Sequence, residues 1–430
     1  MEKIIGIRRE DKNIWERRVP LIPKHVKELK DNHNIKTILQ PFPRRAFLEN
    51  EYLEAGAEFN EDLSECPVVL AVKEIPIRLI TPNKTYIFFS HTIKGQDYNM
   101  PLLRKLMEEK CTLIDYECIK NADGRRLVFF GRFAGVAGMI DAFHGYGQRL
   151  KALGLENILE EVKSAYNYDD MEDAKKHLAK VGEKIKSSGL PVEKAPYVFG
   201  FTGYGNVSKG AQEIFDILPF EEIDANDLAK LKSTDNKKLY KVVFKEEHMV
   251  ETKDSANSFE LYDYFNHPEK YVSKFEEHIQ YLSVVINCIF WNEDYPRFMT
   301  KEYFRKSPNG KLDVICDITC DIDGAVEFTH KATDSDNPAY VYNPHDDTYI
   351  DGYAGDGIVD IAVDNLPTEL PKDSSVEFSN ALEPFIPGLV NANLELDFDK
   401  VDFPEEIKRA VIVYKGELTP DYEYLQEYLK

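Results

Sequence analysis

The stretch that most constrains the fold of this chain is YVFGFTGYGNVSKGAQ, residues 197–212. Its apolar run ends at Gly203-Tyr204-Gly205, and a segment with helical character follows, which predicts a strand, a tight turn and a helix start. Glycine suits position 203 because the turn requires unusual φ and ψ angles, and it suits position 205 because the backbone must approach a ligand closely. The free N–H groups at such a helix start bind phosphate. We therefore expect a nucleotide pyrophosphate here; the alternative is a plain turn without a ligand.

The residues around this turn fit a dinucleotide site. Ser208 stands where a third glycine is usual and can add a hydroxyl contact, while Gly210 and Ala211 are small enough for close helix–strand packing. Asp224 lies about 20 residues past the first glycine, where a ribose hydroxyl contact is expected. The expected cofactor-binding residues are Gly203, Gly205, Asn206, Val207, Ser208 and Asp224.

The bulk composition is that of an ordinary globular protein. A length of 430 residues predicts two domains, and no apolar run approaches the ~20 residues that cross a membrane. The opening residues, MEKIIGIRRE, enter a strand-like pattern at once, which argues against a signal or transit peptide. The six cysteines show no CxxC pairing, so we expect reduced thiols, a cytoplasmic location and no metal site.

The net charge of -22 argues against nucleic acid or an anionic membrane as the main partner. Small anionic molecules remain possible partners, because a local arginine cluster can oppose the overall negative field. The sequence leaves open whether the protein is a monomer or a homo-oligomer.

Apolar strands alternate with helical segments between residues 35 and 91, which predicts an α/β unit with a mostly parallel sheet. One strand ends at Lys73-Glu74, and the next ends at His91, with Lys94 close behind. Ligands of open α/β sheets collect at the carboxyl ends of strands, so these groups are candidate acid/base residues. Ordinary surface positions are the alternative.

Arg17 and Arg18 precede the Pro-flanked apolar residues 19–23 at the mouth of a predicted helix. Arginine at such a place can hold a carboxylate through two parallel hydrogen bonds. The alternative is a solvated loop with a surface salt bridge.

Later segments suggest how the domains connect. Glycines at 131, 135 and 138 suit a long helix, residues 131–150, that crosses between domains close to the sheet. We expect a substrate domain of residues 1–133 plus about 370–430, and a dinucleotide-binding domain of residues 134–369 with an insertion around 226–282.

Together these groups suit redox chemistry at a C–N bond. An amine must lose a proton before it attacks a carbonyl, and the carbinolamine oxygen must gain one to leave, so one base and one acid are required. Neighbouring Lys73 and Lys94 would depress each other's pKa and provide a neutral base.

Several segments carry a family resemblance: IGIRREDKNIWERRVPLIPKHVKEL, YIFFSHTIKGQ, LIDYE, FAGVAGMIDAFHGYGQRLKALG, FTGYGNVSKGAQEIF and DNLPTELP. They extend from residue 5 to residue 371 and resemble the lysine–2-oxoglutarate reductase, or lysine-forming saccharopine dehydrogenase, family. The chain is most similar to the reductase half of bifunctional aminoadipic semialdehyde synthases; the second, glutamate-forming half has no counterpart in it.

The resemblance implies an alanine dehydrogenase-like α/β fold of two Rossmann-like domains, with an active-site cleft between them and the C-terminal segment completing the first domain. It implies reductive condensation of L-lysine with 2-oxoglutarate to saccharopine. Lys73 and His91 would be the catalytic acid/base pair, and Arg18 would hold a substrate carboxylate. The other implied substrate-site residues are Glu74, Lys94, Glu117, Arg126 and Asp321.

The cofactor evidence conflicts. The resemblance to the two-enzyme type favours NADP(H), whereas single-activity fungal relatives use NAD(H), and Asp224 at the ribose position would favour NAD(H). We expect NADP(H). The competing functions are an alanine dehydrogenase-like amino-acid dehydrogenase and a catalytically idle nucleotide-binding subunit; a glutamate-forming enzyme is disfavoured because its glycine turn would stand at the extreme N-terminus.

Overall fold

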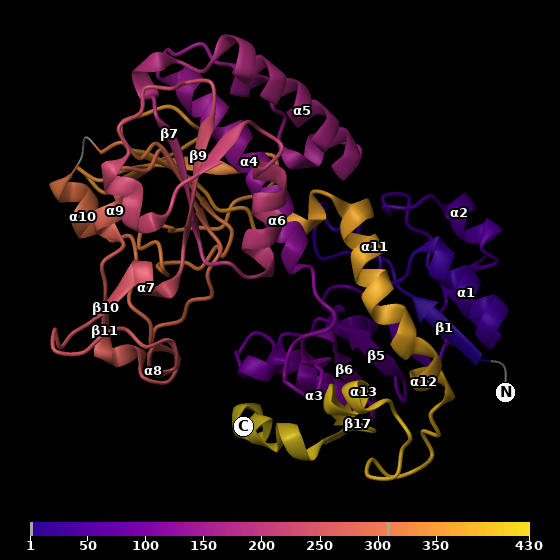
Figure 1. Cartoon of the computed structure of the whole chain (residues 1–430). Helices are drawn as coiled ribbons and strands as arrows, with labels where there is room; N and C mark the ends of the chain where they lie inside the picture. Colours follow the sequence, from indigo (N-terminus) through magenta and orange to yellow (C-terminus); the bar gives the residue numbers. More distant parts are fainter. Residues whose placement is uncertain (1–2, 308–309) are drawn as a thin grey trace. The chain divides into compact units, whose positions relative to one another are not determined.

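The computed structural model describes residues 3–307 and 310–430. The chain divides into two compact units: unit 1 contains Met1–Phe130 and Pro371–Lys430, and unit 2 contains Gly131–Leu370 (Figure 1). The sequence-based division had its boundaries at 133 and about 370. Each unit is built on an eight-stranded, mostly parallel sheet, which confirms the predicted α/β class with two Rossmann-like units.

The sheet of unit 1 has the strand order β18-β17-β6-β5-β4-β1-β2-β3. Strands β1 to β6 pair in parallel, whereas β17 joins β6 antiparallel and β18 joins β17 antiparallel. The inner strands are almost wholly buried, as expected for a parallel sheet covered on both faces. The strands are β1 (Lys3–Ile7), β2 (Ile35–Leu39), β3 (Glu58–Phe59), β4 (Val68–Leu70), β5 (Thr85–Phe88), β6 (Thr112–Asp115), β17 (Val411–Tyr414) and β18 (Glu417–Leu418).

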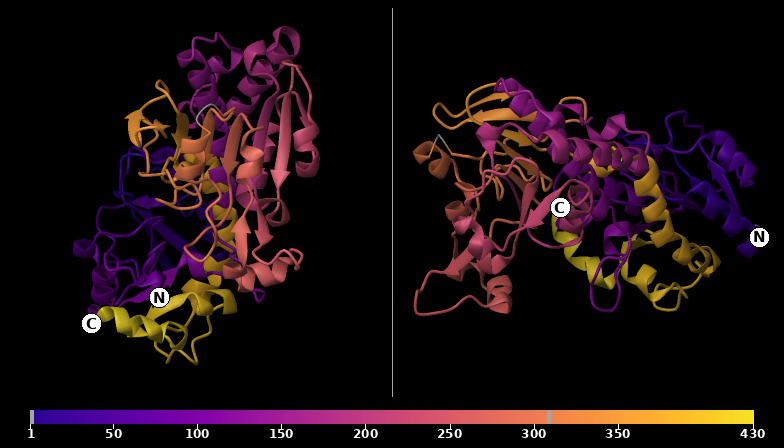
Figure 2. Two further views of the ribbon diagram at one scale, coloured as in Figure 1. Left: turned by 90° about the vertical axis from the view of Figure 1, so that its left-hand side faces the viewer. Right: turned by 45° about the horizontal axis from the view of Figure 1, so that its top comes forward.

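Helices from both ends of the chain cover this sheet. The returning C-terminal segment, orange to yellow in Figures 1 and 2, lies beside the N-terminal elements, because the hydroxyls of Ser375 and Ser379 accept the N–H groups of Val19 and Ile22. The helices are α1 (Pro23–His33), α2 (Glu49–Glu54), α3 (Met100–Glu108), α11 (Pro371–Leu382), α12 (Ile386–Asn391) and α13 (Glu405–Arg409), with 3-10 turns η1 (Ile77–Leu79), η2 (Thr92–Lys94), η3 (Tyr116–Cys118), η10 (Glu383–Phe385) and η11 (Pro420–Leu429).

The sheet of unit 2 has the order β15-β14-β16-β13-β12-β7-β9-β8. Six strands, from β8 to β16 in this order, run in parallel, and β14 and β15 add an antiparallel hairpin at one edge. The strands are β7 (Tyr197–Thr202), β8 (Phe220–Glu222), β9 (Leu239–Phe244), β12 (Val284–Asn287), β13 (Val314–Asp317), β14 (Ala339–Asn343), β15 (Thr348–Asp351) and β16 (Ile358–Ile361).

One expectation needs correction: the presumed insertion at 226–282 contains β9, which pairs directly with β7 inside the sheet. The strand was missed because a lysine, Lys241, stands in its middle. Lys241 is buried, and its ammonium forms ion pairs with Asp216 and Glu222 at 2.9 and 3.3 Å. The charge pattern therefore resembled a solvated segment although the strand is buried.

The remaining elements of unit 2 cover the sheet or extend beyond it. They are α4 (Gly131–Ala152), α5 (Met171–Ser188), α6 (Asn206–Phe215), α7 (Glu246–Met249), α8 (Leu261–Asn266), α9 (Glu276–Ile279), α10 (Lys301–Lys306), the antiparallel ribbon β10 (Val250–Thr252) and β11 (Tyr271–Ser273), and 3-10 turns η4 (Ile158–Glu161), η5 (Ala165–Asn167), η6 (Val192–Lys194), η7 (Ala225–Lys230), η8 (Pro268–Lys270) and η9 (Leu366–Thr368). Among the described residues, no helix combines the length and apolar character needed to cross a bilayer.

The long helix α4 approaches both the sheet and α6 closely. The Gly138 carbonyl accepts a hydrogen bond from the Cys316 thiol of β13 at 3.2 Å, so the expected close approach to the sheet is confirmed there. On another face, a side chain at Gly135 would collide with the Val207 carbonyl, and one at Gly210 would collide with the Arg132 carbonyl. The two glycines allow α4 and α6 to pack backbone against backbone.

We predict that Gly210→Ala destabilises the protein by about 1–3 kcal/mol, because a methyl group at this position overlaps a backbone carbonyl that cannot rotate away. Gly182→Ala, in α5, is the matched control, since the nearest atoms to its Cβ would lie 3.4 Å away and alanine has the higher helix propensity. Urea unfolding measures both. Equal unfolding free energies for the two variants would contradict the close backbone packing of α4 against α6.

Candidate active site and nucleotide site

Three neighbouring strands of unit 1 deliver ionisable side chains to one edge of the sheet. The segments after β4, β5 and β6 carry Glu74, His91 and Glu117 respectively. The His91 Nε2 atom lies 3.7 Å from Glu74 Oε1, and its Nδ1 atom lies 3.9 Å from Glu117 Oε2. The structure thus brings together three of the residues expected from the sequence, with the imidazole between two carboxylates.

The backbone of His91 is held in an unusual conformation. Its φ angle of 55° lies in the left-handed region, which is uncommon for a residue other than glycine and is typical of functional sites. The Asn99 side chain donates to the His91 carbonyl at 2.9 Å, and the preceding Ser90 N–H donates to Asp115 Oδ2 at 2.8 Å. These bonds fix the direction in which the imidazole leaves the chain.

Burial controls the charge of both expected catalytic residues. Burial lowers the pKa of Lys73, and the Arg18 charge lowers it further, while Glu16 opposes both effects. Burial also lowers the pKa of His91, against the pull of Glu74. Among the described residues, nothing forms a hydrogen bond or ion pair with the Lys73 ammonium. These effects favour the neutral form of Lys73, the form that can act as a base.

The cations beside Lys73 differ from the one expected. Besides burial, Arg18 and Lys12 lower its pKa, whereas the exposed Lys94, at the end of η2, is not among the main charges that act on it. Lys12 was not predicted; its ammonium contacts the Glu74 carboxylate at 2.9 Å. The cations that act most on Lys73 thus come from the N-terminal loop, and not from Lys94 as the spacing suggested.

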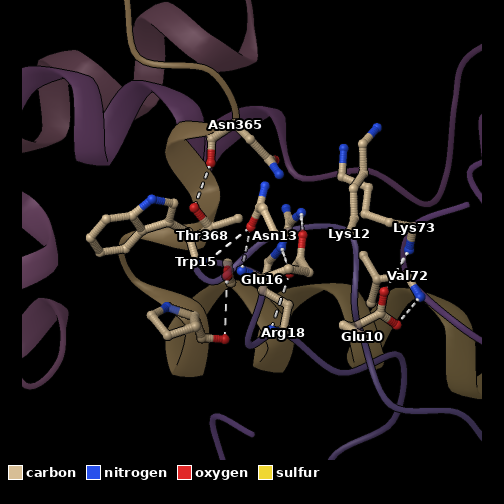
Figure 3. A network of polar contacts seen from close by, with 12 residues as sticks. Glu10, Lys12, Asn13, Trp15, Glu16, Arg18, Val72, Lys73, Asn365 and Thr368 are labelled. Carbon is tan, nitrogen blue, oxygen red and sulfur yellow. Dashed lines mark hydrogen bonds and ion pairs between the residues drawn. The ribbon is translucent and has the colours of Figure 1, made fainter. Parts of the chain in front are cut away.

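Arg18 is engaged inside the protein. Its guanidinium donates to both oxygens of Glu16 at 2.8 and 2.6 Å (Figure 3). It also stacks on the Phe130 ring, 4.1 Å from the ring centroid. The two charged side chains are 1% and 0% exposed, so this is a buried ion pair and not the solvated salt bridge considered as the alternative. A contact between Arg18 and a substrate carboxylate stays a prediction.

Glu10 is a residue of this site that sequence reasoning missed. Its carboxylate accepts the backbone N–H of Val72 at 2.7 Å and that of Lys73 at 3.0 Å (Figure 3). Burial, assisted by the Glu16 charge, raises the pKa of Glu10 to about 7. No sequence signal distinguishes it, because a glutamate in the charged loop RREDK looks like a surface residue. In the structure it fixes the backbone from which the Lys73 side chain leaves.

The other predicted substrate residues are spread over the two units. Arg126, half exposed, forms an ion pair with Glu117 and so adds to the charges around His91. Asp321 belongs to unit 2, in the turn after β13. Their contacts with a substrate stay predictions.

The glycine turn of unit 2 has the geometry of a phosphate cradle. Gly203 has a φ of 80°, and α6 starts at Asn206 without a side-chain cap. Among the described residues, no acceptor is recorded for the backbone N–H groups of Asn206, Val207 and Ser208. A pyrophosphate would satisfy these donors, so the residues present fit a dinucleotide. The Ser208 hydroxyl, in contrast, is buried and accepts a bond from Gln212 at 3.0 Å.

Asp224 lies in a different place from the one its spacing suggests. It follows β8, the outermost strand, and caps η7, where its carboxylate accepts the Asn226 N–H at 2.9 Å. The strand beside β7 is β9, which ends at Phe244. Counting along the chain could not reveal that a later strand is inserted between β7 and β8.

We predict that Glu10→Gln changes how stability depends on pH. The pKa of Glu10 is higher in the folded than in the unfolded chain, so its favourable contribution is complete below about pH 4.5 and is lost as the pH rises through about 7. Between pH 5 and pH 8 the wild type should lose on the order of 2 kcal/mol more unfolding free energy than the variant. Urea unfolding at both pH values tests this; parallel losses would contradict it.

Comparison with known proteins places these sites in a family context. The family model "Alanine dehydrogenase/PNT, N-terminal domain" matches residues 6–137, and "Alanine dehydrogenase/PNT, C-terminal domain" matches residues 224–421. Among solved structures, an L-alanine dehydrogenase superposes with a TM-score of 0.64 over 99% of this chain and 100% of that chain, at 17% identity. A transhydrogenase from Sinorhizobium meliloti gives 0.54, over 97% and 100%, at 14% identity. These matches show the fold.

Curated relatives are closer in sequence. Alpha-aminoadipic semialdehyde synthase of Arabidopsis thaliana is 40% identical over 98% of this chain and 41% of the relative, and the mitochondrial protein of that name from Bos taurus is 37% identical over 99% and 48%. A saccharopine dehydrogenase (NAD(+), L-lysine-forming) of Emericella nidulans is 26% identical over 86% and 88%. The chain thus spans less than half the length of the first two relatives, and the resemblance predicted from its motifs is confirmed.

Proposed function

Since the chain belongs to the alanine dehydrogenase/PNT family and is homologous to about half of alpha-aminoadipic semialdehyde synthase, we propose that it condenses L-lysine with 2-oxoglutarate and reduces the imine to saccharopine. The observation that carries the proposal is the ionisable cluster of unit 1, in which His91 lies between two carboxylates beside a desolvated Lys73. A condensation followed by reduction needs such an acid and base.

The residues of the cluster have distinct tasks in this reaction. Neutral Lys73 takes a proton from the substrate ammonium, so that the amine can attack the keto carbon of 2-oxoglutarate. A proton passes from the attacking nitrogen to the oxygen to give the carbinolamine. His91, in the protonated form that the two carboxylates favour against the effect of burial, then gives a proton to the carbinolamine hydroxyl, which leaves as water and forms the protonated imine. Glu74 and Glu117 orient the imidazole and stabilise its charged form. The nicotinamide cofactor, when bound, supplies the hydride that reduces the imine.

We propose further that Arg18, Lys94, Arg126 and Asp321 contact the substrates and that NADP(H) is the preferred cofactor. The fungal relatives whose names contain NAD(+) are less similar, at 26% identity or below, than the semialdehyde synthases. We expect the protein in the cytoplasm, because all six cysteines are free; the animal relatives are named as mitochondrial proteins.

The decisive experiment follows oxidation of NADPH, with NADH in parallel, in the presence of lysine plus 2-oxoglutarate and with each substrate omitted. Oxidation that requires both substrates, with saccharopine detected by mass spectrometry, supports the proposal. Turnover with pyruvate and ammonia instead would favour an alanine dehydrogenase-like activity and overturn it.

We predict that His91→Gln lowers kcat by about 10²–10⁴-fold, since it removes the general acid, with a smaller effect on KM for lysine. His33→Gln is the matched control, because His33 is an exposed residue at the end of α1 in the same unit. Steady-state kinetics of both variants test the assignment. A kcat near that of the wild type for His91→Gln would exclude a role for this imidazole in proton transfer.

A further inference from the structure

The strand order of unit 2 determines where the adenosine end of a dinucleotide lies. In Rossmann units the ribose contact comes from the carboxyl end of the strand beside the glycine-turn strand. That strand is β9, because Thr202 of β7 pairs with Phe244, and the Gly203 N–H donates to the Phe244 carbonyl at 2.9 Å (Figure 1). The residues that follow Phe244 therefore start at the level of the glycine turn.

The segment after β9 lies next to this turn through its side chains as well. Burial, and then the nearby Glu246 carboxylate, raise the pKa of Tyr204, the central residue of the turn, so these two side chains are neighbours. The ring of His248 accepts the backbone N–H of Lys245 at 3.1 Å, which fixes the backbone at this lysine. Lys245 itself is exposed, and no described residue forms an ion pair or hydrogen bond with its ammonium.

Three carboxylates surround Lys245: Glu246, which acts on Tyr204, the exposed Glu247, and Asp224. Asp224 lies within electrostatic reach of Lys245 and His248, but its carboxylate accepts both the backbone and the side-chain N–H of Asn226 at 2.9 Å. Glu247 lies 3.8 Å from the His248 ring. An exposed ammonium at the ribose corner of the turn is suited to a phosphate group.

We propose that Lys245, and not Asp224, determines the choice of nucleotide by binding the 2′-phosphate of the adenosine ribose. This inference rests on the proposed nicotinamide-dependent function and names the residue that selects its cofactor. Asp224 acts as the cap of η7.

Calorimetric titration of the intact protein with adenosine 2′,5′-bisphosphate and with 5′-AMP tests the inference without turnover. The wild type should bind the bisphosphate more tightly. Lys245→Ala should weaken the affinity for the bisphosphate by about 10- to 100-fold, the loss expected for one charged hydrogen bond. The affinity for 5′-AMP should stay within about twofold of the wild-type value. Lys237→Ala is the matched control, since Lys237 is also exposed but precedes the opposite end of β9.

Equal weakening of both nucleotides by Lys245→Ala, or no weakening of either, would overturn the inference. So would a wild type that binds the two nucleotides equally well. The proposed function is tested separately: saccharopine formation with a nucleotide preference that Lys245→Ala does not change would remove only the inference. Selective bisphosphate binding that depends on Lys245, in a protein that forms no saccharopine, would remove only the proposed reaction.

Discussion

The buried ion pair between Glu16 and Arg18 is the interaction on which the ionisable cluster of unit 1 depends. Removing two charges from water costs several kcal/mol for each ion, and only good geometry offsets this cost. Here two hydrogen bonds and the face of Phe130 provide it. The pair also acts on its neighbours, because, besides the larger effect of burial, Arg18 lowers the pKa of Lys73 and Glu16 raises that of Glu10. A contact that looks structural thus contributes to the electrostatic environment of both groups.

In unit 2, neutral and charged side chains at the carboxyl ends of neighbouring strands form a chain of hydrogen bonds. Thr202 at the end of β7 donates to Asn287 of β12 at 2.7 Å, and Asn287 donates to Asp317 of β13 at 2.9 Å. Buried polar groups need such partners, and a fully connected chain of them holds neighbouring strand ends in register. The glycine turn therefore starts from a rigid base, which suits a cradle of backbone N–H groups whose positions must match a pyrophosphate.

The sequence was most informative where one residue type is physically required. The turn at Gly203 needs a positive φ, and Lys73 and His91 stand at the ends of apolar strands, so both candidate sites could be proposed from the sequence. It was least informative where partners come from distant parts of the chain. Glu10 lies 62 residues before its partner Val72, and nothing in either segment signals the hydrogen bond. Likewise, spacing alone assigned Asp224 to the ribose, because strand order is not encoded in distance along the chain.

The division of unit 1 between both ends of the chain has a consequence for biosynthesis. Strand β6 gains its outer neighbour only when β17, residues 411–414, has been made, whereas every strand of unit 2 precedes residue 371. During vectorial synthesis unit 2 can therefore fold as one continuous block. Until β17 has been made, the edge of β6 stays unpaired. The outer strands β17 and β18 of the first sheet are therefore synthesised after every strand of unit 2.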